Sequence, residues 1–293
     1  MVKRMSTTNS NDDDDTSPKY PVGIHWFRNG LRLHDNPCLL EATKSCQTLL
    51  PLVIIDPDAP FALTQGVKAG CIRAQFLLEC HQELHDNMKT MDSQLIVIRG
   101  TPAVILPQLV DLVGAQALYY EQESAAPIRE ADSKVLDAIR QTSIAGKELQ
   151  VHGFDTHTLH PIEHYLAKCK GGSAPSTYGG FTKIFESMTV PAPVETVTKV
   201  PKLPEKCMEK IEEQYNKDRN IIGIPSLQDL GYDEKDLKNR KRAGIDFDGG
   251  EDAGLKLLEQ VMKRTQWVVT FEKPKTSPNA LKVDTTGLSP CTY

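Results

Sequence analysis

The chain has 293 residues, of which 39% are hydrophobic and 25% are charged, a balance that supports a packed core and argues against global disorder. Its formal net charge of −5 disfavours a broad basic surface that binds nucleic acid, because phosphate binding depends on clustered Lys and Arg. Its seven cysteines include no Cys-x-x-Cys pair, so neither a disulfide framework nor a zinc ribbon fits, and a reducing compartment is expected.

The first 20 residues lack the apolar stretch of a secretory signal, and the aspartate run at 12–15 is unlike an organelle transit peptide. Residues 1–19 are poor in apolar side chains and are expected to form a disordered tail. No stretch of the chain approaches the ~18 apolar residues that span a membrane. These features together predict a nuclear or cytoplasmic protein with no membrane partner.

The region after the tail alternates between short apolar runs and longer amphipathic stretches. The apolar runs predict five strands at 22–27, 48–55, 94–100, 116–120 and 148–153, and the stretches between them predict four helices at 37–46, 67–90, 102–113 and 128–141. Strands separated by helices of this length indicate an α/β fold with right-handed crossovers and a parallel sheet. Pro51 interrupts the second run and fits only at the edge of a sheet or at the beginning of a strand.

The alternation stops after about residue 155. Short helices are predicted at 157–170 and 178–188, followed by a proline-rich extended linker at 191–206. The segment 250–268 predicts one amphipathic helix, whose apolar stripe is made by Leu255, Leu257, Leu258, Val261 and Met262.

The sequence lacks the usual phosphate-binding and hydrolase motifs. No G-x-G-x-x-G follows a predicted strand, and there is no Walker A sequence and no G-x-S-x-G elbow. Ordinary dinucleotide, P-loop and serine-hydrolase chemistry are therefore disfavoured.

The histidines give weak metal candidates. His81 and His85 lie one turn apart on a predicted helix, but two ligands do not complete a zinc shell, and partly solvated helix histidines are the favoured interpretation. A structural role is likewise favoured for His157, His160 and His164, because no carboxylate or thiol stands at a matching spacing. No metal site is predicted.

A basic run, KNRKR at 238–242, has two equally favoured interpretations. It can be a nuclear localisation signal or a phosphate contact, or it can be a solvated loop beside the acidic residues at 233–236.

The loop after the first strand carries polar residues in an informative order. Asn36 followed by Pro37 predicts the N-cap and first residue of a helix. Arg28, Arg32 and Asp35 stand at the carboxyl end of a strand, where open α/β sheets bind ligands. The slightly favoured alternative is structural, with Arg28 and Asp35 pairing to brace the loop.

A second polar segment lies near the end of the chain. Thr285, Thr286, Gly287 and Ser289 offer hydroxyl and backbone N–H groups that can bind an anion or simply cap a helix.

Taken together and in order, several segments resemble the cryptochrome/photolyase family. HWFRNGLRLHDNP resembles the opening of the family's α/β domain, and HTLHPIEHYLAKCKGG, PSTYGGFTKIFESM and PAPVET resemble the connecting region of the animal cryptochrome and (6-4) photolyase branch. SLQDLGYD, FEKPKTSPNAL and TTGLSP then follow in the family's order. The resemblance implies a Rossmann-like α/β antenna domain, a linker and the first helices of an α-helical FAD domain. It also implies that the FAD diphosphate is held by Thr285, Thr286, Gly287, Leu288 and Ser289.

The expected domains are a tail at 1–19, the α/β domain at 20–155, connecting helices and linker at 156–206, and a truncated beginning of the FAD domain at 207–293. The FAD pocket is expected to be incomplete, and no catalytic residue is assigned to this chain. With only two tryptophans, the chain cannot assemble a tryptophan electron-transfer chain. The family's antenna pigment, a deazaflavin or folate, is doubtful because Ala126 and Ala131 stand where the family tends to have an acid and an arginine.

Three functions stay open from the sequence. The resemblance implies a blue-light flavoprotein that signals light, as in circadian photoreception, or repairs ultraviolet-damaged DNA, although this chain alone is not expected to be catalytic or to bind DNA. The second function is a non-enzymatic interaction module with protein partners. The third, suggested by the fold class alone, is a small-ligand or adenine-nucleotide binder of the Rossmann-like group.

Overall fold

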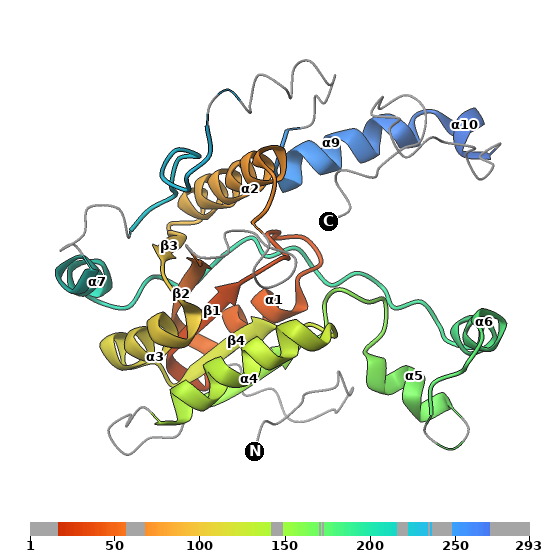
Figure 1. Ribbon diagram of the computed structural model, residues 1–293, viewed down its shortest axis with the longest axis horizontal. Helices are drawn as coiled ribbons and strands as arrows, with labels where there is room; N and C mark the ends of the chain where they lie inside the picture. Colours follow the sequence, from red (N-terminus) through yellow and green to blue (C-terminus); the bar gives the residue numbers. More distant parts are fainter. Residues whose placement is uncertain are drawn as a thin grey trace. The chain divides into compact units, whose positions relative to one another are not determined.

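The computed structural model describes residues 17–56, 68–141, 149–169, 171, 173–215, 222–233, 235 and 248–269. Their contacts divide into two compact units, one formed by 1–51 with 103–205 and the other by 52–102 with 206–293. The strands form one five-stranded sheet in the order β3-β2-β1-β4-β5 (Figure 1). The pairings of β1 with β4, β4 with β5 and β2 with β3 are parallel, so the predicted α/β class is confirmed.

All five predicted strands are present. They are β1 (Tyr20–Phe27), β2 (Cys46–Ile55), β3 (Ile96–Arg99), β4 (Ala117–Glu121) and β5 (Gln150–Phe154). The inner strands are buried along most of their length, as expected of a sheet covered on both faces.

The expectation for Pro51 is wrong, because this residue lies inside β2, which has a neighbouring strand on each side. Its missing N–H is tolerated on the β3 side because β2 pairs with β3 only from Leu52 onward.

The four predicted crossover helices are also present. They are α1 (Pro37–Ser45), α2 (Cys71–Thr90), α3 (Pro102–Val113) and α4 (Ala126–Gln141). Helix α1 lies over β1 and β4 (Figure 1) and also packs on β5. It buries Cys38, Leu39 and Ala42 completely.

The sheet face under α1 carries a row of polar side chains. In the strand register, His25 of β1 stands beside Tyr119 of β4, and Tyr119 stands beside His152 of β5. The rings of Tyr119 and His152 stack at 4.7 Å, and Cys38 Sγ lies 3.7 Å from His25 Nδ1. Burial lowers the pKa of His25 to about 3 and also lowers the pKa of His152, so both imidazoles are neutral at pH 7.

The predicted connecting helices are α5 (Ile162–Lys168) and α6 (Tyr178–Glu186), and neither has a buried residue. The following chain is extended with no helix or strand from 189 to 204, as the prolines predicted. Two backbone hydrogen bonds attach it, from Val197 N–H to Leu33 O and from Leu49 N–H to Lys202 O. Helix α7 (Cys207–Tyr215) comes next.

The single helix predicted at 250–268 is divided into α9 (Glu251–Met262) and α10 (Thr265–Val269). The N–H of Arg264 bonds to Val261 O, a tight turn that ends α9. Of the predicted apolar stripe, Val261 is buried, whereas Leu255, Leu258 and Met262 are 39%, 40% and 56% exposed. Within the described ranges, no helix has the length and apolar character of a membrane span.

Candidate functional site

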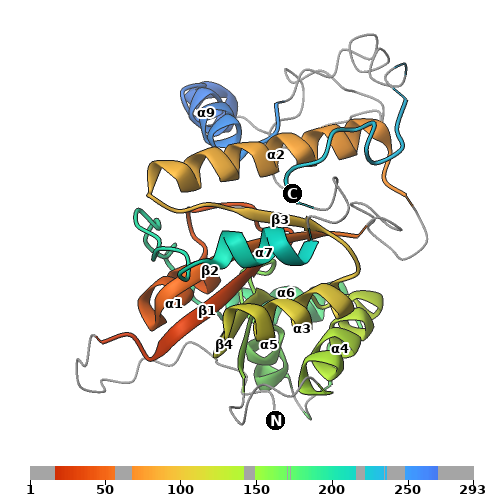
Figure 2. The same cartoon turned by 90° about the vertical axis from the view of Figure 1, so that its left-hand side faces the viewer.

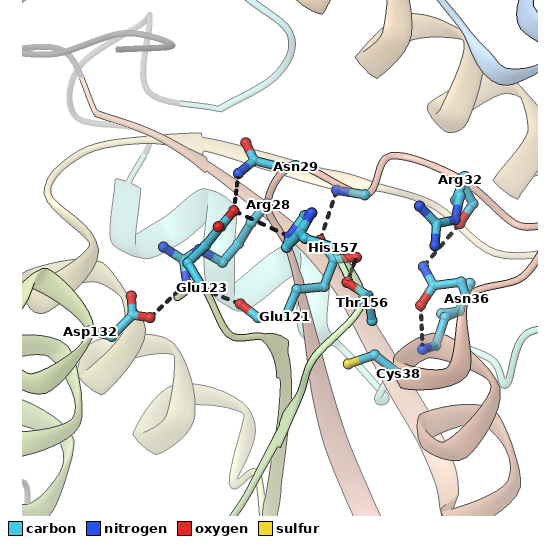
Figure 3. Close-up of polar contacts among 12 residues, drawn as sticks. Arg28, Asn29, Arg32, Asn36, Cys38, Glu121, Glu123, Asp132, Thr156 and His157 are labelled. Atoms are coloured by element: carbon cyan, nitrogen blue, oxygen red, sulfur yellow. Dashed lines mark hydrogen bonds and ion pairs between the residues drawn. The ribbon is translucent and has the colours of Figure 1, made fainter. Parts of the chain in front are cut away.

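The carboxyl ends of β1, β4 and β5 bring three polar loops together. Because these strands are parallel neighbours, the residues that follow them meet at one edge of the sheet. The side chains drawn together in Figure 3 include Arg28 and Asn29 after β1, Glu121 and Glu123 at the end of β4, Asp132 of α4, and Thr156 and His157 after β5. We call these seven residues and Gly30 the carboxyl-end cluster.

Glu121 is at the centre of the cluster and is only 1% exposed. Its carboxylate accepts the N–H of Gly30 at 2.7 Å and the hydroxyl of Thr156 at 2.8 Å. A Cβ added to Gly30 would lie 1.9 Å from Glu121 Oε1, so only glycine leaves room for this approach. The strand order reverses between β1 and β4, which is where a doubly wound sheet offers a ligand crevice. The buried Glu121 carboxylate lies at this point of the sheet, at the end of β4.

Arg28 connects the first loop to α4. Its Nη1 donates to the carbonyl of Glu121 at 3.0 Å and to Asp132 Oδ2 at 2.9 Å, and its guanidinium lies 4.9 Å from the ring centre of Trp26. Burial raises the pKa of Asp132, and the charge and hydrogen bond of Arg28 act in the opposite direction. The guanidinium thus supplies the counter-charge for a mostly buried carboxyl group.

The predicted pairing of Arg28 with Asp35 is therefore wrong. Asp35 has a positive φ of 46° in a turn, and its Oδ1 accepts the N–H of Val194 at 2.9 Å. The two partners of Arg28 lie 93 and 104 residues away in the sequence, so the pair is formed by the fold and not by the loop.

The predicted N-cap is confirmed. The Asn36 side chain accepts the N–H of Leu39 at 2.9 Å, Pro37 begins the helix, and Asn36 Nδ2 donates to the carbonyl of Arg32. The Arg32 guanidinium in turn donates to the carbonyl of Asp35 at 2.9 Å. Arg32, Asp35 and Asn36 thus hold the turn that leads into α1, and they do not join the carboxyl-end cluster.

The solvent side of the cluster is closed by Glu123 and His157. Asn29 Nδ2 donates to Glu123 Oε1, and His157 Nε2 lies 3.2 Å from the same carboxylate and 3.9 Å from Glu121 Oε2. The adjoining cavity, lined by His157 and five neighbouring residues, has a volume of about 10 Å³. That is close to the space of a single water molecule, so the cluster is a brace and not an open ligand site, although Asp132 Oδ1 is buried without a hydrogen-bond partner.

Several sequence-predicted candidates lie apart from this cluster. His81 is buried on α2, and His85 Nδ1 lies 3.1 Å from the carbonyl of Leu95. In the part of the chain that the structure describes, no three His, Cys, Asp or Glu side chains gather closely enough to hold a metal ion. The basic run at 238–242 and the predicted diphosphate residues Thr285, Thr286, Gly287, Leu288 and Ser289 lie outside the described residues.

Sequence reasoning missed the acidic half of the cluster, which is Glu121, Glu123 and Asp132. A usable signal was present, because Glu121 and Glu123 follow the predicted strand at 116–120, where a carboxylate is placed at the ligand edge of the sheet. Nothing local indicated Asp132, which lies seven residues inside a helix.

Comparison with known proteins gives consistent matches. The family model described as DNA photolyase matches residues 23–202. Cryptochrome-1 of Gallus gallus is 35% identical over 270 residues, which cover 91% of this chain and 40% of that protein. The chain therefore spans well under half the length of this curated relative.

Solved structures agree on the fold. A cryptochrome from Synechocystis has a TM-score of 0.63 and 23% identity, covering 85% of this chain and 47% of that chain. An archaeal photolyase from Sulfolobus tokodaii, solved with two FAD molecules, has a TM-score of 0.50 and 18% identity, covering 64% of this chain and 41% of that chain.

Proposed function

Because this chain belongs to the cryptochrome/DNA photolyase family, we propose that it forms the α/β part of a blue-light flavoprotein that signals light or repairs ultraviolet-damaged DNA. The observation that carries this proposal is the 35% identity to cryptochrome-1 that extends over 91% of the chain. A similarity of that extent includes the sheet, the linker and α9 and is not confined to one motif.

FAD is the cofactor that this function requires, and the carboxyl-end cluster does not fit it. The buried Glu121 carboxylate leaves no space for a Cβ on Gly30, and the adjoining cavity has a volume of about 10 Å³, far less than the ring of a flavin, deazaflavin or folate needs. We assign the FAD diphosphate instead to the hydroxyl and N–H groups of residues 285–289. When bound, FAD supplies light-driven electron transfer, and the carboxyl-end cluster keeps the first loop, β4 and β5 in place.

Diphosphate contacts alone give weak binding. Each hydrogen bond contributes roughly 0.5–1.5 kcal/mol net, or up to ~3 kcal/mol to a charged phosphate, against a loss of roughly 4–15 kcal/mol in translational and rotational freedom. On these contacts alone, FAD is expected to bind no more tightly than about 1 mM.

A chimera tests the proposal directly. Residues 1–289 are joined to the helical remainder of Gallus gallus cryptochrome-1, and flavin is measured by absorbance after gel filtration. We expect bound FAD, reduced at least tenfold by the double change Thr286→Ala and Ser289→Ala, with Ser226→Ala as the matched control. A chimera that folds cooperatively but elutes without flavin, while the relative's own full-length protein retains it, would overturn the proposal.

A second candidate function is a non-enzymatic interaction module. It is favoured by the closed state of the carboxyl-end cluster together with the exposure of apolar side chains on α5 and α6, where Tyr178 is 83% exposed and Phe181 is 40% exposed. This function predicts that the isolated chain binds a protein partner without flavin, and that Tyr178→Ser with Phe181→Ser abolishes the binding.

A further inference from the structure

Helix α9 begins without a capping side chain of its own. Its N-cap is Gly250, whose φ of 120° lies in the region that favours glycine, and Gly249 precedes it. The first N–H groups of a helix have no partner within the helix, so partners must come from elsewhere.

Two carboxylates of α2 bond to this part of the chain, one to the first turn of α9 and one to the residue before its N-cap. The N–H of Asp252 donates to Glu83 Oε1 at 2.8 Å, and the N–H of Gly249 donates to Glu79 Oε2 at 2.8 Å. Glu79 and Glu83 are four residues apart and therefore lie on one face of α2. Helix α9 lies beside α2 (Figure 2).

The two glycines make this close approach possible. A Cβ on Gly249 would lie 2.2 Å from the carbonyl oxygen of Phe76, which is backbone and cannot move aside. A Cβ on Gly250 would lie 2.1 Å from Glu83 Oε2. The chain thus lies directly on α2 at the point where α9 starts.

The rest of α9 is lightly held. Val261 is its only buried residue, whereas α2 buries six of its own residues, including Ala74, Leu84 and Met88. Helix α2 is therefore well packed and α9 is weakly packed. The hydrogen bonds at the start of α9 are the main attachment of α9 at that end.

We propose that Glu83 is a tertiary N-cap that, together with the bond from Gly249 to Glu79, anchors and positions α9 on α2. The anchor acts by accepting hydrogen bonds and not by pairing charges, because the acidic residues Glu251 and Asp252 face it from α9. Burial and the repulsion from these two carboxylates raise the pKa of Glu83, whereas the hydrogen bonds from the backbone of Asp252 and Glu251 act in the opposite direction. Under the proposal, an uncharged acceptor of the same shape keeps the anchor. This inference goes beyond the proposed function and holds with or without FAD.

Hydrogen exchange of the whole chain tests the anchor. In Glu83→Leu we expect the amides of 249–262 to exchange roughly tenfold faster, the equivalent of losing a helix cap, with exchange in α3 and β4 unchanged. Glu83→Gln keeps an oxygen acceptor and should retain the wild-type protection. The matched control is Asp86→Leu, the same kind of change on an exposed residue one turn along α2.

Two results would overturn the proposal: unchanged exchange at 249–262 in Glu83→Leu, or equal losses in Glu83→Gln and Glu83→Leu. If Glu83→Leu unfolds the chain, which α3 and β4 would report in the same experiment, Gly250→Ala provides the second variant. We expect faster exchange at 249–262 in that variant, and unchanged exchange there would also contradict the anchor.

Discussion

Helices α1 and α6 have the same length and the same kind of beginning, but they differ in what they pack against. Each has nine residues, and in each a side chain caps the first turn, Asn36 in α1 and Thr177 in α6. Helix α1 buries four residues against the sheet, whereas α6 buries none. Local sequence signals are therefore sufficient to start a helix, but the contribution of that helix to stability depends on the surface that receives it.

The largest expected effect comes from the buried side of this comparison. Leu39 of α1 is fully buried, so Leu39→Ala removes apolar contacts and leaves a cavity next to β1. We expect a loss of about 2–5 kcal/mol in the free energy of unfolding, measured by urea denaturation. A loss below about 1 kcal/mol would show that α1 does not belong to the cooperative core.

The polar residues under α1 make its packing sensitive to acid. Burial lowers the pKa of His25 to about 3 from an unfolded value of 6.5. Between these two pH values the imidazole is protonated in the unfolded chain and neutral in the folded chain. Stability must then fall as the pH drops below 6.5, and His25 alone contributes a loss of about 2 kcal/mol between pH 7 and pH 5. Urea denaturation at both values, with His25→Leu as the comparison, measures this contribution. If that variant shows the same pH dependence as the wild type, His25 is not buried and neutral.

The predicted and the observed carboxylate partners of Arg28, Asp35 and Asp132, extend the comparison of exposed and buried positions to charged groups. The Asp132 side chain is 10% exposed and pairs with Arg28, so Asp132→Ala leaves a mostly buried guanidinium without its counter-charge. We expect a loss of about 1–3 kcal/mol in unfolding free energy. Asp35→Ala removes one exposed hydrogen bond to Val194 and should cost about 1 kcal/mol or less. Equal losses of unfolding free energy in Asp132→Ala and Asp35→Ala would contradict the distinction between the carboxyl-end cluster, which contains Asp132, and the turn that contains Asp35.

Prediction from sequence succeeded where the signal was local and periodic. The strands, the crossover helices and the Asn36 cap all follow from patterns within about 20 residues, and the structure confirms them. The partners of Arg28 could not be found in this way, because the fold alone brings Glu121 and Asp132 to it. The apolar stripe of α9 predicted a buried helix face, but most of that face is exposed. Periodicity predicts that a helix has an apolar face and does not predict whether another element covers it.

The smallest effect is expected on the exposed side of the comparison. Tyr178 opens α6 and is 83% exposed, so Tyr178→Ala removes little contact within the chain and should change the free energy of unfolding by no more than about 0.5 kcal/mol. The matched control is Tyr119→Ala, the same change at a fully buried tyrosine of β4, for which we expect a loss of roughly 3–5 kcal/mol. A loss above about 1 kcal/mol for Tyr178→Ala would mean that α6 is covered in solution. Repeating the denaturation at tenfold lower protein concentration then distinguishes a second copy of the chain, which makes the loss concentration-dependent, from packing within the chain, which does not.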